Sequence, residues 1–205
     1  MHVLLINGSP HKEGCTFTAL SEVAGALEKN GISTTLFHIG TRPVAGCIAC
    51  GKCKGTDSGC VLAGEPYASC RELVAKSDGL VVGSPVYYAG PTGSLCALLD
   101  RLFFSSKALL EGKPAAAVVS CRRGGASATF DRLNKYFGIN QMPIVTSQYW
   151  NSVHGNTPDE VRQDLEGMQT MRVLGNNMAW LLKTMAASQE PLPAQEPWQR
   201  TNFIR

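Results

Sequence analysis

The sequence lacks any apolar stretch near the roughly 20 residues that a membrane-spanning helix needs. It also lacks a secretion signal, because the apolar run at residues 3–6 has no basic lead before it and no cleavage site after it. Basic residues are scattered in a chain of net charge +3, and their longest cluster is the pair Arg122 and Arg123. We therefore expect a cytoplasmic protein that binds neither a membrane nor nucleic acid.

Two common nucleotide-binding signatures are also missing. The chain has no G-x-G-x-x-G, the fingerprint of dinucleotide-binding proteins, and no Gly-Lys-Ser/Thr that would close a P-loop. At 205 residues it is long enough for one domain to bury a core without disulfide bonds. Without a secretion signal, its eight cysteines therefore indicate reduced thiols rather than a disulfide framework.

Short apolar runs that end in turn residues alternate with helical patterns along the chain. The predicted strands are residues 3–7, 34–38, 80–83, 115–120 and 143–149. The predicted helices are residues 16–29, 67–76, 94–104, 126–136 and 158–187, the last capped by Thr157 with Pro158 at its first position. This alternation predicts one α/β domain over residues 1–186, with a parallel sheet covered on both faces. Pro191, Pro193 and Pro197 exclude a helix from residues 187–205, which we expect to form an extended tail.

The first strand leads into the loop GSPHKEGCT, residues 8–16, and then into a helix. Ligands of parallel sheets bind outside the carboxyl ends of the strands, and a helix N-terminus there offers unpaired N–H groups to a phosphate. Ser9 and Thr16 add hydroxyl groups, and Gly14 allows a close backbone approach. The alternative is a polar turn that only caps its helix.

Two further loops are expected at the same edge of the sheet. In GSPVYYAGPTG, residues 83–93, Tyr87 and Tyr88 are suited to a planar ring, although tyrosines that merely seal the end of the core are the alternative. In CRRGGAS, residues 121–127, Arg122 or Arg123 either meets an anionic group or is solvated. The segment YWNSVHG, residues 149–155, is expected to follow the fifth strand. It would place Trp150, Asn151 and His154 at this edge, against a substrate or a partner subunit, and simple packing is the alternative.

Four cysteines lie within fourteen residues on a glycine-rich loop, residues 46–60, at the spacing C-x2-C-x2-C-x6-C. They are Cys47, Cys50, Cys53 and Cys60. Thiolates this close together can bind one soft metal centre, and three of them two residues apart are typical of iron–sulfur clusters. A zinc site is less favoured because it usually needs two separated C-x2-C pairs. Ordinary thiols remain the third interpretation.

With these loops in order, the sequence resembles the flavodoxin-like NADPH-dependent FMN reductase superfamily. GSPHKEGCT is similar to that superfamily's phosphate loop GSPR-x-x-GNT, and GSPVYY with LLDR at residues 98–101 is similar to its second flavin loop and following helix. The resemblance covers residues 1 to about 182 and implies a flavodoxin-like sheet in the order 2-1-3-4-5 with bound FMN. It implies that the FMN phosphate contacts Ser9, His11, Gly14, Cys15 and Thr16. It also implies that the isoalloxazine ring is lined by Pro85, Val86, Tyr87 and Tyr88 and flanked by Ser120, Gly124 and Gly125.

Two positions depart from the phosphate-loop pattern of this superfamily. His11 stands where Arg is usual, and Cys15 stands where Asn is usual. The backbone N–H of residue 15 would still serve a phosphate, so FMN binding is still expected. A cysteine at a helix N-terminus ordinarily has a lowered pKa, so a thiol reactive toward oxidants is one interpretation of Cys15. The alternative, which is favoured, is a passive small residue.

A subset of the superfamily, the iron–sulfur flavoproteins, carries a compact four-cysteine loop after the second strand. The resemblance to this subset implies that Cys47, Cys50, Cys53 and Cys60 bind one [4Fe–4S] cluster that exchanges electrons with FMN. It implies reduction by NADH, NADPH or a small protein such as ferredoxin, and transfer to a small-molecule acceptor. The alternatives are a flavodoxin-type carrier, although flavodoxins are strongly acidic and this chain is slightly basic, or a quinone or azo-compound reductase. Flavin sites in the superfamily commonly lie between subunits, which implies a homodimer or homotetramer. The proline-rich tail also has little to pack on within a small domain, which favours the same expectation.

Overall fold

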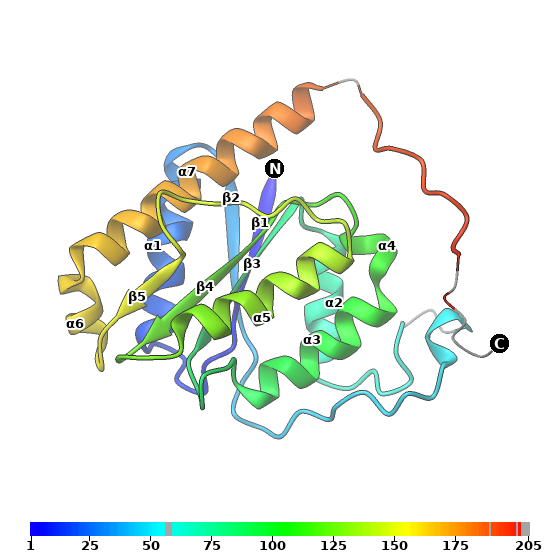
Figure 1. Cartoon of the computed structure of the whole chain (residues 1–205), viewed down its shortest axis with the longest axis horizontal. Helices are drawn as coiled ribbons and strands as arrows, with labels where there is room; N and C mark the ends of the chain where they lie inside the picture. The colour runs from blue at the N-terminus through cyan, green and yellow to red at the C-terminus, as the bar shows by residue number, and fades with distance from the viewer. Residues whose placement is uncertain (56–58, 189, 200, 202–205) are drawn as a thin grey trace.

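The computed structural model describes residues 1–55, 59–188, 190–199 and 201. Its centre is a five-stranded sheet in the order β2-β1-β3-β4-β5, in which all neighbouring strands are parallel (Figure 1). The strands are β1 (His2–Asn7), β2 (Ser33–His38), β3 (Gly79–Pro85), β4 (Ala115–Cys121) and β5 (Ser152–His154). The order confirms the doubly wound, flavodoxin-like sheet expected from the sequence.

Helices cover both faces of the sheet, as the alternating pattern predicts (Figure 1). They are α1 (Cys15–Lys29), η1 (Lys52–Gly55), α2 (Tyr67–Ala75), α3 (Gly93–Ser105), α4 (Lys107–Leu110), α5 (Ala126–Ile139), α6 (Pro158–Gln163) and α7 (Leu165–Ala187). One apolar core joins the sheet to α1, α6 and α7, and a second joins it to α2, α3, α4 and α5. No helix of the described residues combines the length and apolar character that crossing a bilayer requires.

The strand β1 shows why the sequence forms this three-layer arrangement. Val3 and Leu5 belong to the core under α1 and α7, whereas Leu4 and Ile6 belong to the core on the other face. All four side chains are fully buried. Successive side chains of a strand point to opposite faces, so a strand covered on both sides must be apolar at every position.

The fifth strand lies later in the chain than predicted, at Ser152–His154 instead of residues 143–149. The chain makes one bridge to β4, where Val145 N–H donates to the Ala115 carbonyl at 2.8 Å, and then leaves the sheet. It returns at Asn151, whose carbonyl accepts a hydrogen bond from Val119 N–H at 2.9 Å. Most side chains of the intervening excursion are exposed, because they lie outside the ladder and do not alternate into the core.

The helix predicted at residues 158–187 is two helices, because the chain breaks at Asp164. The Thr157 side chain accepts from Glu160 N–H and Pro158 follows it, so the predicted cap of α6 is confirmed. Asp164 then leaves the helical conformation, and its Oδ1 accepts from Gly167 N–H at 2.9 Å as the cap of α7. Its Oδ2 accepts from His154 N–H at 2.7 Å. Asp164 therefore joins α7 to the carboxyl end of β5.

We expect Asp164→Ala to lower the free energy of unfolding by about 2 to 3 kcal/mol. The change removes a helix cap and a second hydrogen bond to a charged group. Urea denaturation followed by circular dichroism measures the difference. Asp159→Ala is the matched control, because that exposed carboxylate pairs only with Arg162 in the same helix and should change stability by less than about 0.5 kcal/mol. Equal effects of the two substitutions would contradict the proposed role of Asp164.

The described part of the C-terminal tail has no helix or strand and runs back along the domain (Figure 1). Leu192 packs on Gly112, in the turn after α4. Gln195 contacts the side chains of Glu111 and Gln141 by hydrogen bonds. The expectation that the tail has little to pack on within its own domain is therefore wrong, because the tail packs against the end of α4 and the turn after α5.

Candidate functional site

Three loops meet at the carboxyl edge of the sheet and are held together by hydrogen bonds. Gly8 N–H donates to the Gly83 carbonyl at 2.9 Å, and Val86 N–H donates to the Ser120 carbonyl at 3.0 Å. The hydroxyl groups of Thr16 and Ser120 lie 2.8 Å apart. The structure thus joins the segments at residues 8–16, 83–93 and 120–125, which the sequence analysis placed at one edge.

The N-terminus of α1 is left open for an anion. Its N-cap, Gly14, has no side chain that could accept a hydrogen bond, and the first turn contains no acidic residue. The backbone N–H groups of Thr16 and Phe17 donate to no acceptor among the described residues. A depression of about 540 Å³ lies here, lined by Pro10, His11, Lys12, Glu13, Gly14, Cys15, Asn156, Thr157 and Pro158. Free N–H groups at the positive end of a helix dipole suit the phosphate of FMN.

The hydroxyl groups predicted to contact the phosphate already have partners within the protein. Ser9 is 3% exposed, and its Oγ accepts from His11 N–H at 3.1 Å. Thr16 is 1% exposed and bonds to Ser120. The His11 side chain is exposed and lines the depression together with Gly14 and Cys15. The structure therefore brings all five predicted residues into one loop, and their contact with phosphate stays a prediction.

His38, at the end of β2, holds the phosphate loop in place. Its Nε2 lies 2.8 Å from the Ser9 carbonyl oxygen. A carbonyl oxygen only accepts hydrogen bonds, so Nε2 must carry the proton. The sequence analysis did not identify this contact, because Ser9 follows β1 whereas His38 ends β2, and their spacing carries no local signal.

The thiol of Cys15 does not have the low pKa expected at a helix N-terminus. Burial raises the pKa of Cys15, and the negative charge of Glu160 raises it further, against a lowering by the residue's own backbone N–H. Its Sγ also lies 3.7 Å from the Gly155 carbonyl. The structure therefore favours the passive alternative, because burial and the charge of Glu160 together raise the pKa more than the backbone hydrogen bond lowers it.

We expect Cys15 in the FMN-free protein to react more slowly with iodoacetamide than Cys15 in the urea-unfolded chain. The thiolate is the nucleophile, and a raised pKa lowers its fraction at neutral pH. The folded-state rate should climb about tenfold per pH unit until the pH passes that raised pKa. Peptide mass spectrometry measures the labelling, and Glu160→Gln should accelerate it. A folded-state rate at pH 7 above the unfolded rate would contradict the pKa direction.

The loop after β3 presents two tyrosines on a tight turn. Tyr87 and Gly90 exchange backbone hydrogen bonds at 2.8 and 3.0 Å, and the two residues between them, Tyr88 and Ala89, have φ angles of 49° and 56°. Such a turn is normally made by Asn or Gly, because other side chains are strained at positive φ. The exposed fraction is 48% for Tyr87 and 107% for Tyr88. Strain retained on an exposed aromatic turn is typical of a binding site rather than of a seal over the core.

The loop after β4 packs directly against this tyrosine turn. Gly125 has φ of 92°, and a Cβ there would lie 2.8 Å from both Val86 Cγ1 and Ala89 Cα. A depression of about 220 Å³ lies between the loops, lined by Val86, Tyr88, Ala89, Cys121, Arg122, Arg123 and Gly124. Pro85 pairs with Ser120 at the base of the two loops. The predicted ring-binding residues are therefore neighbours, and their contact with a flavin ring stays a prediction.

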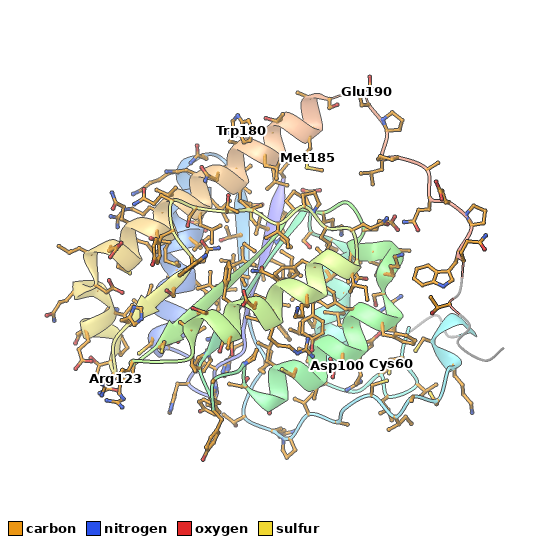
Figure 2. All side chains as sticks on the ribbon, viewed as in Figure 1. Cys60, Asp100, Arg123, Trp180, Met185 and Glu190 are labelled. Carbon is orange, nitrogen blue, oxygen red and sulfur yellow. The ribbon has the colours of Figure 1, made fainter. Side chains whose placement is uncertain are left out.

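The cysteine loop begins after β2 and passes below α3 to η1 (Figure 1). In Figure 2, Cys60 lies beside α3 at the lower edge of the molecule. Cys47 and Cys50 are exposed, Cys53 is half-buried and Cys60 is buried. The predicted loop at residues 46–60 includes residues 56–58, which lie outside the described residues.

The backbone of this loop is curled toward its sulfur atoms. Ala49, Gly51 and Gly59 have φ angles of 52°, 69° and 82°. Ala49 N–H donates to Cys47 Sγ at 3.4 Å. Backbone N–H donors to sulfur stabilise thiolates and tune iron–sulfur clusters. The donor set of four thiols on a curled backbone therefore fits a soft metal centre.

The four thiols are close enough to influence one another. Burial raises the pKa of Cys53, and the negative charges of Cys60, Cys50 and Cys47 raise it further. In residues 1–55, 59–188, 190–199 and 201, no group of three or more Cys, His, Asp or Glu side chains is arranged to hold a metal ion. Metal binding by the four cysteines therefore stays a prediction.

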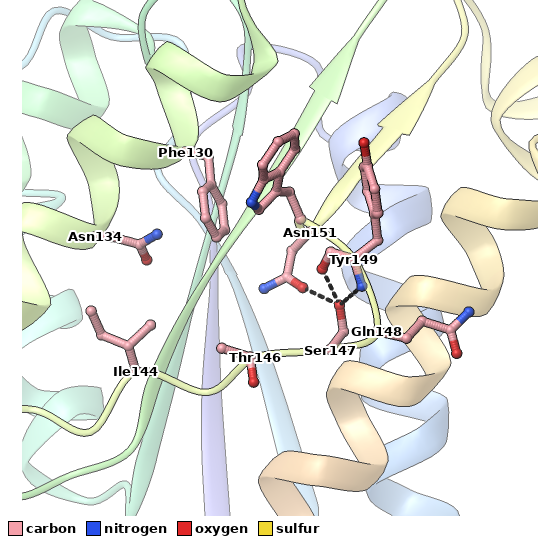
Figure 3. A pocket seen from close by; sticks show the side chains of 9 residues that line it. Phe130, Asn134, Ile144, Thr146, Ser147, Gln148, Tyr149 and Asn151 are labelled. Carbon is pink, nitrogen blue, oxygen red and sulfur yellow. Dashed lines mark hydrogen bonds between the residues drawn. The ribbon is translucent and has the colours of Figure 1, made fainter.

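A separate depression of about 520 Å³ lies along the outer edge of the sheet (Figure 3). Trp150 and Asn151 line it from the excursion that precedes β5, together with Phe130 of α5. The prediction that Trp150, Asn151 and His154 share the carboxyl edge is wrong, because the first two come before β5 and only His154 ends it. Contact of these residues with a substrate or partner stays a prediction.

With the three loops in place, sequence comparison decides the family. The family model described as NADPH-dependent FMN reductase matches residues 1–157. The chain belongs to the NADPH-dependent FMN reductase family. This is a flavodoxin-like, FMN-binding family of oxidoreductases. Contact of FMN with the three loops at the carboxyl edge stays a prediction.

Individual relatives of this FMN reductase family member agree with the assignment. An iron–sulfur flavoprotein of Methanocaldococcus jannaschii is 30% identical over 193 residues, which are 89% of this chain and 98% of that protein. The structure of RosB with bound 8-demethyl-8-formylriboflavin-5′-phosphate superposes with a TM-score of 0.71 at 14% identity, covering 100% of this chain and 94% of RosB. A flavodoxin from Archaea superposes at 0.59 with 12% identity, covering 89% of this chain and 99% of the flavodoxin. The two structural likenesses support the fold alone.

Proposed function

We propose that this protein transfers electrons from NADH, NADPH or a small donor protein such as ferredoxin, through FMN, to a small-molecule acceptor. We also propose that Cys47, Cys50, Cys53 and Cys60 hold a [4Fe–4S] cluster as a second redox group. The observation that carries the proposal is the open N-terminus of α1, whose free N–H groups face a depression beside two loops suited to a flat ring. FMN supplies the exchange between two-electron and one-electron carriers, and an iron–sulfur cluster carries single electrons.

The residues of the chain have distinct parts in this proposal. The N–H groups of Thr16 and Phe17 bind the phosphate, and His38 keeps that loop in position through Ser9. Val86 and the Tyr88 turn enclose one side of the flavin ring and exclude water from it. The exposed arginine pair beside Gly124 favours an anionic donor such as a nicotinamide nucleotide, whose phosphates attract guanidinium groups.

Three observations support the cluster. The cysteine spacing is too even for two zinc knuckles, Ala49 N–H donates to Cys47 Sγ within the loop, and the relative from Methanocaldococcus jannaschii is named an iron–sulfur flavoprotein. Cys60 is buried at the base of the loop, where exclusion of water protects a cluster from loss.

The test is purification without oxygen, followed by flavin, iron and sulfide analysis of the full chain. We expect one FMN and about four iron and four sulfide ions per chain, the composition of one [4Fe–4S] cluster. The holoprotein is then mixed with NADH, NADPH or reduced ferredoxin, and flavin bleaching is followed. Absence of iron after reconstitution would overturn the cluster, and failure of all three donors to bleach the flavin would overturn the electron path.

We further propose that the protein is a homodimer or homotetramer. Large apolar side chains are exposed beside the outer strand and on α7, including Ile144, Tyr149, Trp150 and Trp180. A second copy of the chain that covers them would remove this apolar surface from water. Light scattering measures the mass, and a monomer over the full concentration range would contradict the assembly.

A further inference from the structure

One buried side chain holds both ends of the cysteine loop. Arg101 of α3 is 4% exposed, and its Nη1 donates to the Ala45 carbonyl at 3.1 Å. Its Nη2 donates to the Leu62 carbonyl. Ala45 lies two residues before Cys47, and Leu62 lies two residues after Cys60. A single guanidinium therefore closes the segment that carries all four cysteines.

A second guanidinium lies behind the same loop. A Cβ on Gly59, the residue before Cys60, would lie 2.7 Å from Arg71 Nε and 2.7 Å from the Tyr67 hydroxyl. The guanidinium carbon of Arg101 lies 4.7 Å from the centre of the Tyr67 ring. Arg71, Tyr67 and Arg101 thus form a layer directly under the buried end of the cysteine loop.

These two cations are not balanced by carboxylates of the described residues. Neither Arg71 nor Arg101 takes part in any of the ion pairs there. The Nε atom of each is buried and has no hydrogen-bond partner among those residues. Burying an unpaired charge costs several kcal/mol, and an apolar side chain of similar volume would fill the space without that cost. The positive charges of Arg71 and Arg101 therefore indicate an anionic group at the cysteine loop.

We propose that Arg101 and Arg71 form a cationic base for the cluster. Arg101 is a positioning residue that closes the loop, and both charges stabilise the thiolates and the more negative, reduced state of the cluster. The electrostatic part rests on the proposed function, because it needs the cluster. The closure by Arg101 is a property of the protein chain alone and can be measured without iron.

The physical basis is the sign of the charge change. Four thiolates give an oxidised [4Fe–4S] centre a net negative charge, and gaining one electron makes it more negative by one. A nearby positive charge lowers the free energy of the reduced form more than that of the oxidised form, because the Coulomb energy scales with the charge. It also favours thiolate over thiol, which strengthens iron binding.

Three substitutions distinguish the closure of the cysteine loop by Arg101 from the effect of the two positive charges on the cluster. Arg101→Lys keeps the charge but cannot reach both carbonyls with a rigid fork, so it tests closure. Arg71→Gln leaves both carbonyl bonds of Arg101 intact, so it tests charge. Arg101→Gln removes both properties. The matched control is Arg132→Gln, which removes a half-exposed guanidinium from α5 that pairs with Asp100.

In the iron-free protein, we expect the amides of residues 45–55 to exchange with deuterium at least about tenfold faster in Arg101→Gln and Arg101→Lys than in wild type. Arg71→Gln and Arg132→Gln should match wild type. In the reconstituted protein, we expect a lower cluster reduction potential in Arg71→Gln and Arg101→Gln. Arg101→Gln should also release iron to a chelator at least about tenfold faster. Retained FMN binding and circular dichroism identify the variants that remain folded.

The outcomes are distinguishable. Unchanged exchange in iron-free Arg101→Gln and Arg101→Lys would overturn loop closure. A wild-type cluster whose potential is the same in Arg71→Gln would overturn the electrostatic role, and the proposed function would stand. A wild-type protein that takes up no iron would overturn the cluster and the electrostatic role together. Asp57 lies outside the described residues, so Asp57→Asn is included. A rise of the cluster potential in Asp57→Asn that is as large as the fall in Arg71→Gln would assign the charge balance of the arginines to that carboxylate.

Discussion

In the Cys50→Ser protein, reconstituted without oxygen, we expect the iron content to fall at least about tenfold below wild type. Cys50 is exposed, so the substitution disturbs no packing, and a serine hydroxyl is a much poorer ligand for iron than a thiolate. The FMN content should stay at one per chain, because the flavin loops lie elsewhere at the sheet edge. Iron and flavin are measured in the same sample, together with the visible spectrum.

Cys96→Ser is the control for a general loss of thiols. Cys96 lies half-buried in α3, outside the cysteine loop, and burial raises its pKa. This variant should keep the wild-type iron content. If Cys50→Ser keeps its iron as well, Cys50 is not a ligand. If the two variants lose iron to the same extent, the loss comes from damage to the fold rather than from removal of a ligand.

The second large effect is expected from Gly14→Asp, which should weaken FMN binding at least about 100-fold, or about 2.7 kcal/mol. Aspartate is a favourable N-cap, and Gly14 already has an extended conformation that it can adopt. Its carboxylate would bind the free N–H groups of Thr16 and Phe17 and would repel the phosphate dianion. Fluorescence quenching of added FMN measures the affinity.

Gly14→Asn is the matched control, because it has the same shape without the charge. Both variants place a Cβ 2.9 Å from the Cβ of His11, so both require the same small shift of the loop. We expect Gly14→Asn to lose affinity by no more than about tenfold, or about 1.4 kcal/mol. Equal losses in the two variants would show that loop distortion, rather than a phosphate at this helix end, explains the effect. Unchanged binding in both would place the phosphate elsewhere.

Local patterns predicted most of the fold correctly. β1 to β4 and the helices α1, α2, α3 and α5 begin and end within a few residues of their expected bounds. These elements are recognisable because burial on both faces requires continuous apolar strands and one apolar stripe on each helix. The wrong predictions concern the outer edge of the sheet. There, β5 has a neighbour on one side only, and Asp164 ends a helix through a side-chain contact that no periodicity signals.

Some features of the candidate site were likewise predictable from the sequence and others were not. The flavin loops were predictable because each follows directly on a strand, and the carboxyl ends of parallel strands must meet. The raised pKa of Cys15 was not predictable, because burial in the folded chain raises it and Glu160, far along the chain, raises it further. Arg101 left a weak signal, a charged residue on the apolar side of a helix beside Leu98 and Leu102. Only its contacts with two carbonyls showed what it holds.

The family resemblance supplied the strand order, whereas the sequence by itself determined the layers and the chemistry of the two candidate centres, four thiols on one loop and a phosphate loop at a helix end. These properties depend on residues that are neighbours in the chain. The tertiary structure alone decided that the α1 N-terminus is uncapped and open, that the pKa of Cys15 is raised, and that two guanidinium groups with buried Nε atoms lie under the cysteine loop. Burial, pKa and charge balance are set by contacts between distant segments, and folding creates those contacts.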